Sequence, residues 1–187
     1  MQKKNIILAI TGASGSIYAK LLIKQLEKHQ SQLDNVACLF SKNAPDIWQH
    51  ELNQSPSLPS FITTYELNDF HSPLASGSSK FDTMIICPCS MGTLGRIAAG
   101  TSDDLLLRAA DVMLKEKRKL ILVPRETPFS LIHLRNMNTL SEAGATIIPA
   151  IPSFYSKPET IEDVAMTVVE RILAHVGIEG DGFVWGG

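Results

Sequence analysis

The sequence predicts an α/β fold with a doubly wound parallel sheet. Apolar runs, each about the length of one strand, alternate along the chain with segments of helical periodicity. The first run passes through a glycine-containing turn directly into a helical pattern. With 187 residues and 44% hydrophobic content, the chain is expected to form one domain over residues 1–187, with a flexible C-terminal tail over 179–187.

The first element is an apolar run over Asn5–Ile10, which breaks at Thr11–Gly15 and resumes as a helix. The two glycines allow a sharp turn, and N–H groups at a helix N-terminus attract anions such as phosphate. The Thr11 and Ser14 hydroxyls would add donors. The spacing matches neither the dinucleotide fingerprint nor a Walker loop, which favours a mononucleotide or another small phosphate. A plain strand-to-helix turn, in which glycine only relieves strain, explains the pattern equally well.

The later elements follow from periodicity and from the turns that bound them. Strands are expected at Val36–Phe40, Thr83–Cys87, Leu120–Val123 and Thr146–Ile148, and helices at Asn43–Leu52, from Asp103 onward, at Ser130–Ala143 and at Ile161–Val176. Residues 54–79 are expected to form a long loop of the kind that often serves as a lid or binding segment, although surface exposure explains its polar residues about as well. Loops after parallel strands gather at one edge of the sheet. Ser90–Thr93, Arg125 and Glu126 are therefore expected beside the Thr11–Gly15 turn.

Composition excludes several classes of function. A net charge of -2, from 17 basic and 19 acidic side chains, gives no electrostatic case for nucleic acid or an anionic membrane surface. No apolar run reaches the roughly 20 residues that a membrane span needs, and the first one is too short for a signal peptide, so a cytoplasmic protein is expected. The three cysteines cannot form an even disulfide framework. The histidines show no paired spacing, so no metal site is predicted.

Several short motifs occur in a specific order and spacing. They are Gly12–Gly15, Ser76–Ser79, Cys87–Leu94, Arg108–Val112, Leu114–Glu116, Val123–Glu126 and Phe154–Tyr155. Together they resemble the flavin prenyltransferases of the UbiX/Pad type, within the wider flavin-binding Cys-decarboxylase superfamily. The resemblance implies a Rossmann, flavodoxin-like fold and a homo-oligomer, commonly a dodecamer. It also implies transfer of a dimethylallyl group from dimethylallyl monophosphate to N5 and C6 of reduced FMN. The prenylated FMN would serve a partner decarboxylase, often in ubiquinone biosynthesis.

The resemblance also implies roles for individual residues. The FMN contacts would be Gly12, Ala13, Ser14, Ser41, Ser90, Met91, Gly92, Thr93 and Arg125. The prenyl phosphate would be bound by Arg108, Lys115, Tyr155 and Arg171. The groups that handle protons or organise the site would be Ser14, Glu51, Lys115 and Glu126. A glutamate can protonate the leaving phosphate if burial raises its pKa.

The chemistry of allylic transfer fits these residue types. Departure of the phosphate leaves a delocalised cation, which the aromatic faces of Phe70, Tyr155 and Trp185 would stabilise. Asp103 and Asp104 resemble half of a metal–pyrophosphate motif, but Leu107 stands where a third carboxylate would be needed. This difference favours a monophosphate donor without magnesium.

Two other functions remain open at this point. An FMN-dependent cysteine decarboxylase of the same superfamily would need a histidine at the ligand edge and an Asn-Met clamp. Asn136-Met137 is present but falls within a predicted helix. A flavin carrier without chemistry would bind FMN and ignore the prenyl phosphate.

Overall fold

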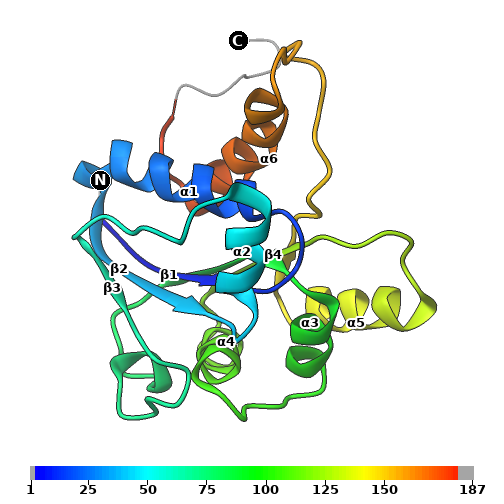
Figure 1. Cartoon of the computed structure of the whole chain (residues 1–187). Coiled ribbons are helices and arrows are strands. Elements are labelled where there is room, and N and C mark those ends of the chain that lie inside the picture. The colour runs from blue at the N-terminus through cyan, green and yellow to red at the C-terminus, as the bar shows by residue number, and fades with distance from the viewer. Residues whose placement is uncertain (1–2, 181–187) are drawn as a thin grey trace.

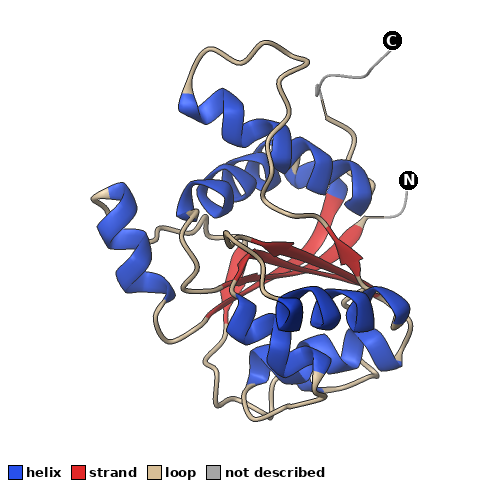
Figure 2. Ribbon diagram, turned by 90° about the vertical axis from the view of Figure 1, so that its right-hand side faces the viewer, coloured by secondary structure: helices blue, strands red, loops and turns tan. Residues whose placement is uncertain are grey.

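The computed structural model describes residues 3–180, in which a central sheet carries helices on both faces (Figures 1 and 2). The strands are β1 (Lys4–Ile10), β2 (Leu33–Phe40), β3 (Ile62–Thr64), β4 (Thr83–Cys89), β5 (Lys119–Pro124) and β6 (Thr146–Ile147). The helices are α1 (Ser16–Lys28), α2 (Ala44–Leu52), α3 (Met91–Ala98), α4 (Leu105–Lys115), α5 (Leu131–Glu142) and α6 (Ile161–Val176), with short 3-10 helices η1 (Gln30–Gln32) and η2 (Pro73–Ala75). The α/β class that the sequence predicts is confirmed.

The order of the strands explains where a ligand crevice forms. The sheet is parallel throughout, in the order β3-β2-β1-β4-β5-β6. The chain moves outward from β1 to β3, returns to pair β4 with the other side of β1, and then moves outward in the opposite direction. In such sheets the loops that follow the two central strands diverge to opposite faces and leave a crevice between them. The crevice of this fold therefore lies beyond the carboxyl ends of β1 and β4.

Alternation along β1 divides the core into two layers. Ile6, Leu8 and Ile10 are buried against α1, α2 and α6, whereas Ile7 and Ala9 are buried against α3 and α4. Figure 2 shows the two helical layers on either side of the sheet. A parallel sheet covered on both faces needs apolar residues on both, and this requirement explains the unbroken apolar run in β1.

The prediction of one continuous loop over residues 54–79 was wrong at β3. This strand pairs with Val36, Ala37 and Cys38 of β2 at the edge of the sheet. It has three residues, and both of its threonines are exposed, so it lacks the apolar alternation that indicates a strand.

Two further findings bear on the sequence-based expectations. No helix within residues 3–180 is long and apolar enough to cross a membrane. Trp185 and most of the predicted 179–187 tail lie outside the described residues.

Candidate functional site at the centre of the sheet

The turn after β1 brings Glu51 to the N-terminus of α1. The backbone N–H of Gly15 donates to Glu51 Oε1 at 3.1 Å and Oε2 at 3.0 Å, and that of Ser16 donates to Oε2 at 2.7 Å. The N–H of Gly12 donates to Ser41 Oγ at 3.1 Å. These N–H groups were predicted to bind phosphate, but they are paired within the protein. The anion at the start of α1 is the carboxylate of Glu51.

The environment of Glu51 keeps it ionised at neutral pH. Burial acts to raise the pKa of this carboxyl group, but hydrogen bonds from the Ser14 hydroxyl and from Ser16 and Gly15 outweigh it. The resulting pKa lies below the ordinary value of a glutamate. A glutamate would act as the acid if its pKa were raised, and this condition is not met at Glu51. An ionised carboxylate that accepts a hydroxyl hydrogen bond is suited to receive a proton.

Arg125 binds the carbonyl end of the Ser14–Gly15 peptide group, whose N–H end binds Glu51. Its Nε donates to the Ser14 carbonyl oxygen at 2.9 Å, and its backbone N–H donates to Cys89 O at 3.3 Å. The Ser14–Gly15 peptide is thus bound by a cation at its carbonyl and by a carboxylate at its N–H. This arrangement fixes the exposed Ser14 side chain at the crevice.

Gly15 is required by both its backbone conformation and its surroundings. Its φ is +117°, and a Cβ at this position would lie 2.9 Å from Cδ2 of Tyr18 and 3.7 Å from Cγ of Arg125. Tyr18, one helical turn after the glycine, therefore packs directly against this turn, a contact that the sequence did not predict.

The loop after β4 forms the facing wall. Ser90 caps α3, because its Oγ accepts from the Thr93 N–H at 3.2 Å and donates to Thr93 Oγ1 at 3.0 Å. Gly92 is exposed, and a Cβ built on it would meet nothing within 4 Å. The two loops are joined by Thr11, whose hydroxyl bonds Pro88 O and the Ser90 N–H. The prediction that this hydroxyl serves a ligand is not met, because both bonds are internal.

The neighbouring cysteines have no nucleophilic character. Cys87 and Cys89 are fully buried, and burial raises the pKa of both thiols, that of Cys89 to about 12. A thiol with such a pKa stays protonated at neutral pH. Within residues 3–180 there is no group of three or more His, Cys, Asp and Glu side chains arranged to hold a metal.

Two of the predicted phosphate-binding cations, Lys115 and Arg108, lie away from the crevice. Lys115 ends α4 and pairs with Glu116, four residues before β5 begins. Lys115 therefore lies near the amino end of β5. The six residues of β5 separate that end of the strand from the crevice by about 17 Å. Arg108 donates from Nε to Ala75 O at 3.0 Å and pairs with Asp111 at 2.6 Å. These contacts hold Arg108 against η2, on the α4 face of the sheet.

Ala13 and Met91, two of the predicted FMN contacts, have buried side chains. Three other predicted residues, Arg171, Tyr155 and Glu126, are exposed. Arg171 lies on α6, one turn before His175, whose carbonyl accepts from Lys119 at the amino end of β5. This position is toward the edge opposite the crevice. Tyr155 is 70% exposed in the segment between β6 and α6. Glu126 follows β5 at the crevice edge and accepts from the Thr127 N–H at 3.0 Å.

Large apolar side chains are exposed on two segments, the start of α5 and the segment from the end of β6 through the first residue of α6. In Figure 1 the second segment extends away from the sheet and runs beside α6. Seven residues on these segments are at least 50% exposed: Leu131, Ile132, Leu134, Ile151, Phe154, Tyr155 and Ile161. Apolar surface of this kind is typical of a protein–protein interface.

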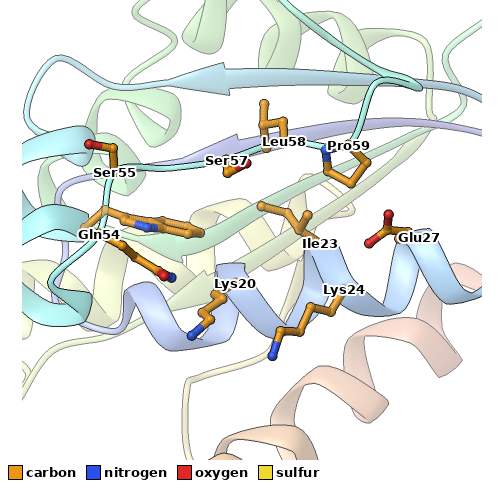
Figure 3. A pocket seen from close by; sticks show the side chains of 10 residues that line it. Lys20, Ile23, Lys24, Glu27, Gln54, Ser55, Ser57, Leu58 and Pro59 are labelled. Carbon is orange, nitrogen blue, oxygen red and sulfur yellow. The ribbon is translucent and has the colours of Figure 1, made fainter.

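A separate pocket of about 300 Å³ lies between α1 and the segment after α2 (Figure 3). Ile23, Trp48 and Leu58 contribute its apolar lining. The amines of Lys20 and Lys24 extend away from residues 55–59 (Figure 3). Ligand sites combine an apolar lining with converging polar groups, which these lysines do not provide. None of the predicted site residues lines this pocket.

Known proteins match nearly the whole chain. A family model described as Flavoprotein matches residues 1–174. The flavin prenyltransferase UbiX of Methanocaldococcus jannaschii is 47% identical over 184 residues, covering 97% of this chain and 98% of the relative. The flavin prenyltransferase UbiX of Pseudomonas aeruginosa is 44% identical over 194 residues, covering 95% of this chain and 91% of the relative.

Solved structures are similarly close. AnUbiX (PadA1) in complex with FMN and dimethylallyl pyrophosphate has a TM-score of 0.92 at 40% identity, covering 100% of this chain and 99% of the other. A dodecameric FMN-dependent UbiX-like decarboxylase from Escherichia coli O157:H7 has a TM-score of 0.89 at 38% identity, covering 98% of this chain and 100% of the other. A PPC decarboxylase mutant, with a TM-score of 0.66 at 21% identity, covers 93% of this chain and 100% of the other and shows likeness of fold alone.

Proposed function

The chain belongs to the UbiX flavin prenyltransferase family, and from that premise we propose that it transfers a dimethylallyl group from dimethylallyl monophosphate to N5 and C6 of reduced FMN. The sequence-based resemblance to this family is confirmed. The observation that carries the proposal is the Ser14–Gly15 peptide, held between Arg125 and Glu51 at the crevice. It brings the hydroxyl of Ser14, the ionised carboxylate of Glu51 and the guanidinium of Arg125 together in the fold.

The residues at the crevice are suited to hold a flavin. Gly92 leaves open space beside the loop after β4, and the exposed Ser14 hydroxyl lies on the facing loop. Among the described residues Arg125 bonds through Nε and its backbone N–H, so its two terminal guanidinium nitrogens are available to an anion. These features support FMN contacts from Gly12–Ser14, Ser41, Ser90–Thr93 and Arg125.

Ser14 and Glu51 provide a path for a proton. Closing the new ring requires the loss of the proton on C6 of the flavin. The Ser14 oxygen can accept that proton while its own hydroxyl proton passes to the ionised carboxylate of Glu51, to which it is hydrogen-bonded. Glu51 is therefore assigned as the proton acceptor, which leaves Glu126 as the candidate acid for the departing phosphate.

The guanidinium of Arg125 supplies positive charge at the crevice for the leaving phosphate. A monophosphate carries less charge than a diphosphate and needs fewer cations. Because AnUbiX has been solved in complex with dimethylallyl pyrophosphate, the monophosphate and the diphosphate should be compared directly as donors.

The proposal is tested by incubating the protein anaerobically with reduced FMN and dimethylallyl monophosphate, without added metal. We expect a covalent product whose mass exceeds that of FMN by one isoprene unit. Formation of this product from the diphosphate alone would overturn the choice of donor. Return of unmodified FMN would indicate a flavin carrier, and release of carbon dioxide from a cysteine-terminated acid would indicate the decarboxylase.

We further propose that the protein is a cytoplasmic homo-oligomer, a dodecamer, whose product serves a prenyl-FMN-dependent decarboxylase, as in ubiquinone biosynthesis. The exposed apolar residues of α5 and of the segment before α6 support self-association. The distance of Lys115 from the crevice supports a site completed by a second copy. A neighbouring subunit would bring this cation to the Ser14 loop.

A subunit-mixing experiment tests this shared site. Glu51→Gln and Lys115→Ala subunits are each expected to be inactive alone. After co-expression in equal amounts, about one site in four should combine an intact Glu51 with an intact Lys115 and regain activity. A control mixture of Glu51→Gln with Ser14→Ala should stay inactive, because these residues lie on the same side of the site. No recovery in the first mixture would show that the site does not join these two residues from different copies.

A further inference from the structure

Thr11 lies at the point where the hydrogen-bond ladder between the two central strands ends. The regular pairing of β1 with β4 runs from Ile6 and Thr83 to Ala9 and Ile86 and goes no further. Two residues later β4 contains Pro88, which has no N–H to donate. The backbone alone therefore gives few contacts between the strands just before the two ligand loops begin.

Thr11 supplies the missing contacts, two of them through its side chain. Its hydroxyl donates to Pro88 O at 2.7 Å and accepts from the Ser90 N–H at 2.8 Å. Its backbone N–H also donates to Pro88 O, at 3.3 Å. Thr11 is 2% exposed, so water does not compete for these bonds.

The two loops that these bonds join carry the facing walls of the crevice. Thr11 is followed directly by Gly12–Gly15, and Ser90 is the N-cap of α3. We propose that Thr11 is a positioning residue, whose hydroxyl sets the separation and orientation of the two flavin-binding loops. This role rests on the proposed function for its readout in flavin binding, but the bonds themselves are independent of it.

A matched pair of substitutions separates positioning from stability. Thr83 is also a buried threonine, 3% exposed, and its hydroxyl donates to Asp82 Oδ1 at 2.7 Å. It lies at the opposite end of β4, away from the crevice. Thr11→Val and Thr83→Val each keep the side-chain shape and remove one buried hydroxyl, so both are expected to lower the melting temperature.

The FMN dissociation constant is then measured by flavin fluorescence at a temperature where circular dichroism shows all variants folded. Thr11→Val is expected to weaken FMN binding about tenfold, and Thr83→Val less than about twofold. Thr11→Ser keeps the hydroxyl and should bind FMN as the wild type does. Equal affinities in the two valine variants, or loss of affinity in Thr11→Ser, would overturn the proposal.

Hydrogen exchange in the wild-type protein provides a test that needs neither FMN nor a folded valine variant. The Ser90 amide should exchange slowly, because it donates to a buried oxygen. Rapid exchange at Ser90 would overturn the positioning role even if Thr11→Val does not fold. If the Ser90 amide exchanges slowly but the protein does not bind FMN, the hydrogen bond is supported and the proposed function is contradicted. A failure of the positioning role can thus be told apart from a failure of the proposed function.

Discussion

Replacing Glu51 with glutamine is expected to lower the rate of prenyl transfer by about a hundredfold or more, while FMN affinity changes by less than about threefold. Glutamine has nearly the same shape and keeps one acceptor oxygen for the N–H groups of Gly15 and Ser16. It cannot take up the proton that Ser14 passes on. The rate is measured at saturating FMN and prenyl phosphate, and the affinity by flavin fluorescence.

Glu27→Gln serves as the matched control, because Glu27 is exposed near the C-terminal end of α1, whereas the crevice loop precedes its N-terminal end. An equal loss of rate and of FMN affinity in Glu51→Gln would show that Glu51 is structural. An unchanged rate would show that the proton leaves by another path.

The lowered pKa of Glu51 also links stability to pH. A carboxyl group whose pKa is lower in the folded than in the unfolded protein stabilises the fold above its unfolded pKa, and this contribution disappears as the pH falls through the folded value. The difference in stability between wild type and Glu51→Gln should therefore shrink on acidification below about pH 4.

Replacing Gly15 with alanine is expected to lower the free energy of unfolding by about 2–4 kcal/mol and to abolish flavin binding. The backbone at a φ of +117° is unfavourable for alanine, and the new methyl group would meet the Tyr18 ring at 2.9 Å. Relief of this contact requires movement of the peptide that Arg125 and Glu51 hold. Denaturant unfolding gives the free energy, and flavin fluorescence gives the binding.

Gly144→Ala isolates the backbone contribution. Gly144 also has a positive φ, +101°, but a Cβ there would meet nothing within 4 Å. This variant should lose only about 1–2 kcal/mol and should bind FMN normally. If the two variants lost equal stability and both bound FMN, the contact with Tyr18 would not matter to the site.

The sequence predicted those elements whose local signals agree with their packing. The last helix was expected at Ile161–Val176 and has these bounds, because Thr160 caps its start and Gly177 ends it in a left-handed conformation. The helix from Asp103 onward begins at Leu105, because Asp104 accepts from the Leu107 N–H and so acts as the N-cap. The edge strand β3 was missed because it has three residues, two of them exposed threonines, so only its pairing with β2, 26 residues away, marks it as a strand.

The residues of the candidate site likewise separate into those that sequence patterns could place and those whose positions depend on packing. Ser90–Thr93 and Arg125 could be placed at one edge of the sheet, because parallel strands bring their following loops together. The pairing of Glu51 with the start of α1 depends on how α2 packs beside α1, which no local pattern encodes. The position of Lys115 at the opposite edge likewise follows only from the antiparallel course of α4 against β5.

The occupied N-terminus of α1 has a consequence for ion selectivity. Inorganic phosphate is a common solute and the product of the proposed reaction, and an unpaired helix N-terminus would retain it. Here a tethered carboxylate takes that position and repels a second anion of the same sign. The phosphate group of a ligand must therefore gain its affinity from groups other than the Gly15 and Ser16 N–H groups that Glu51 occupies.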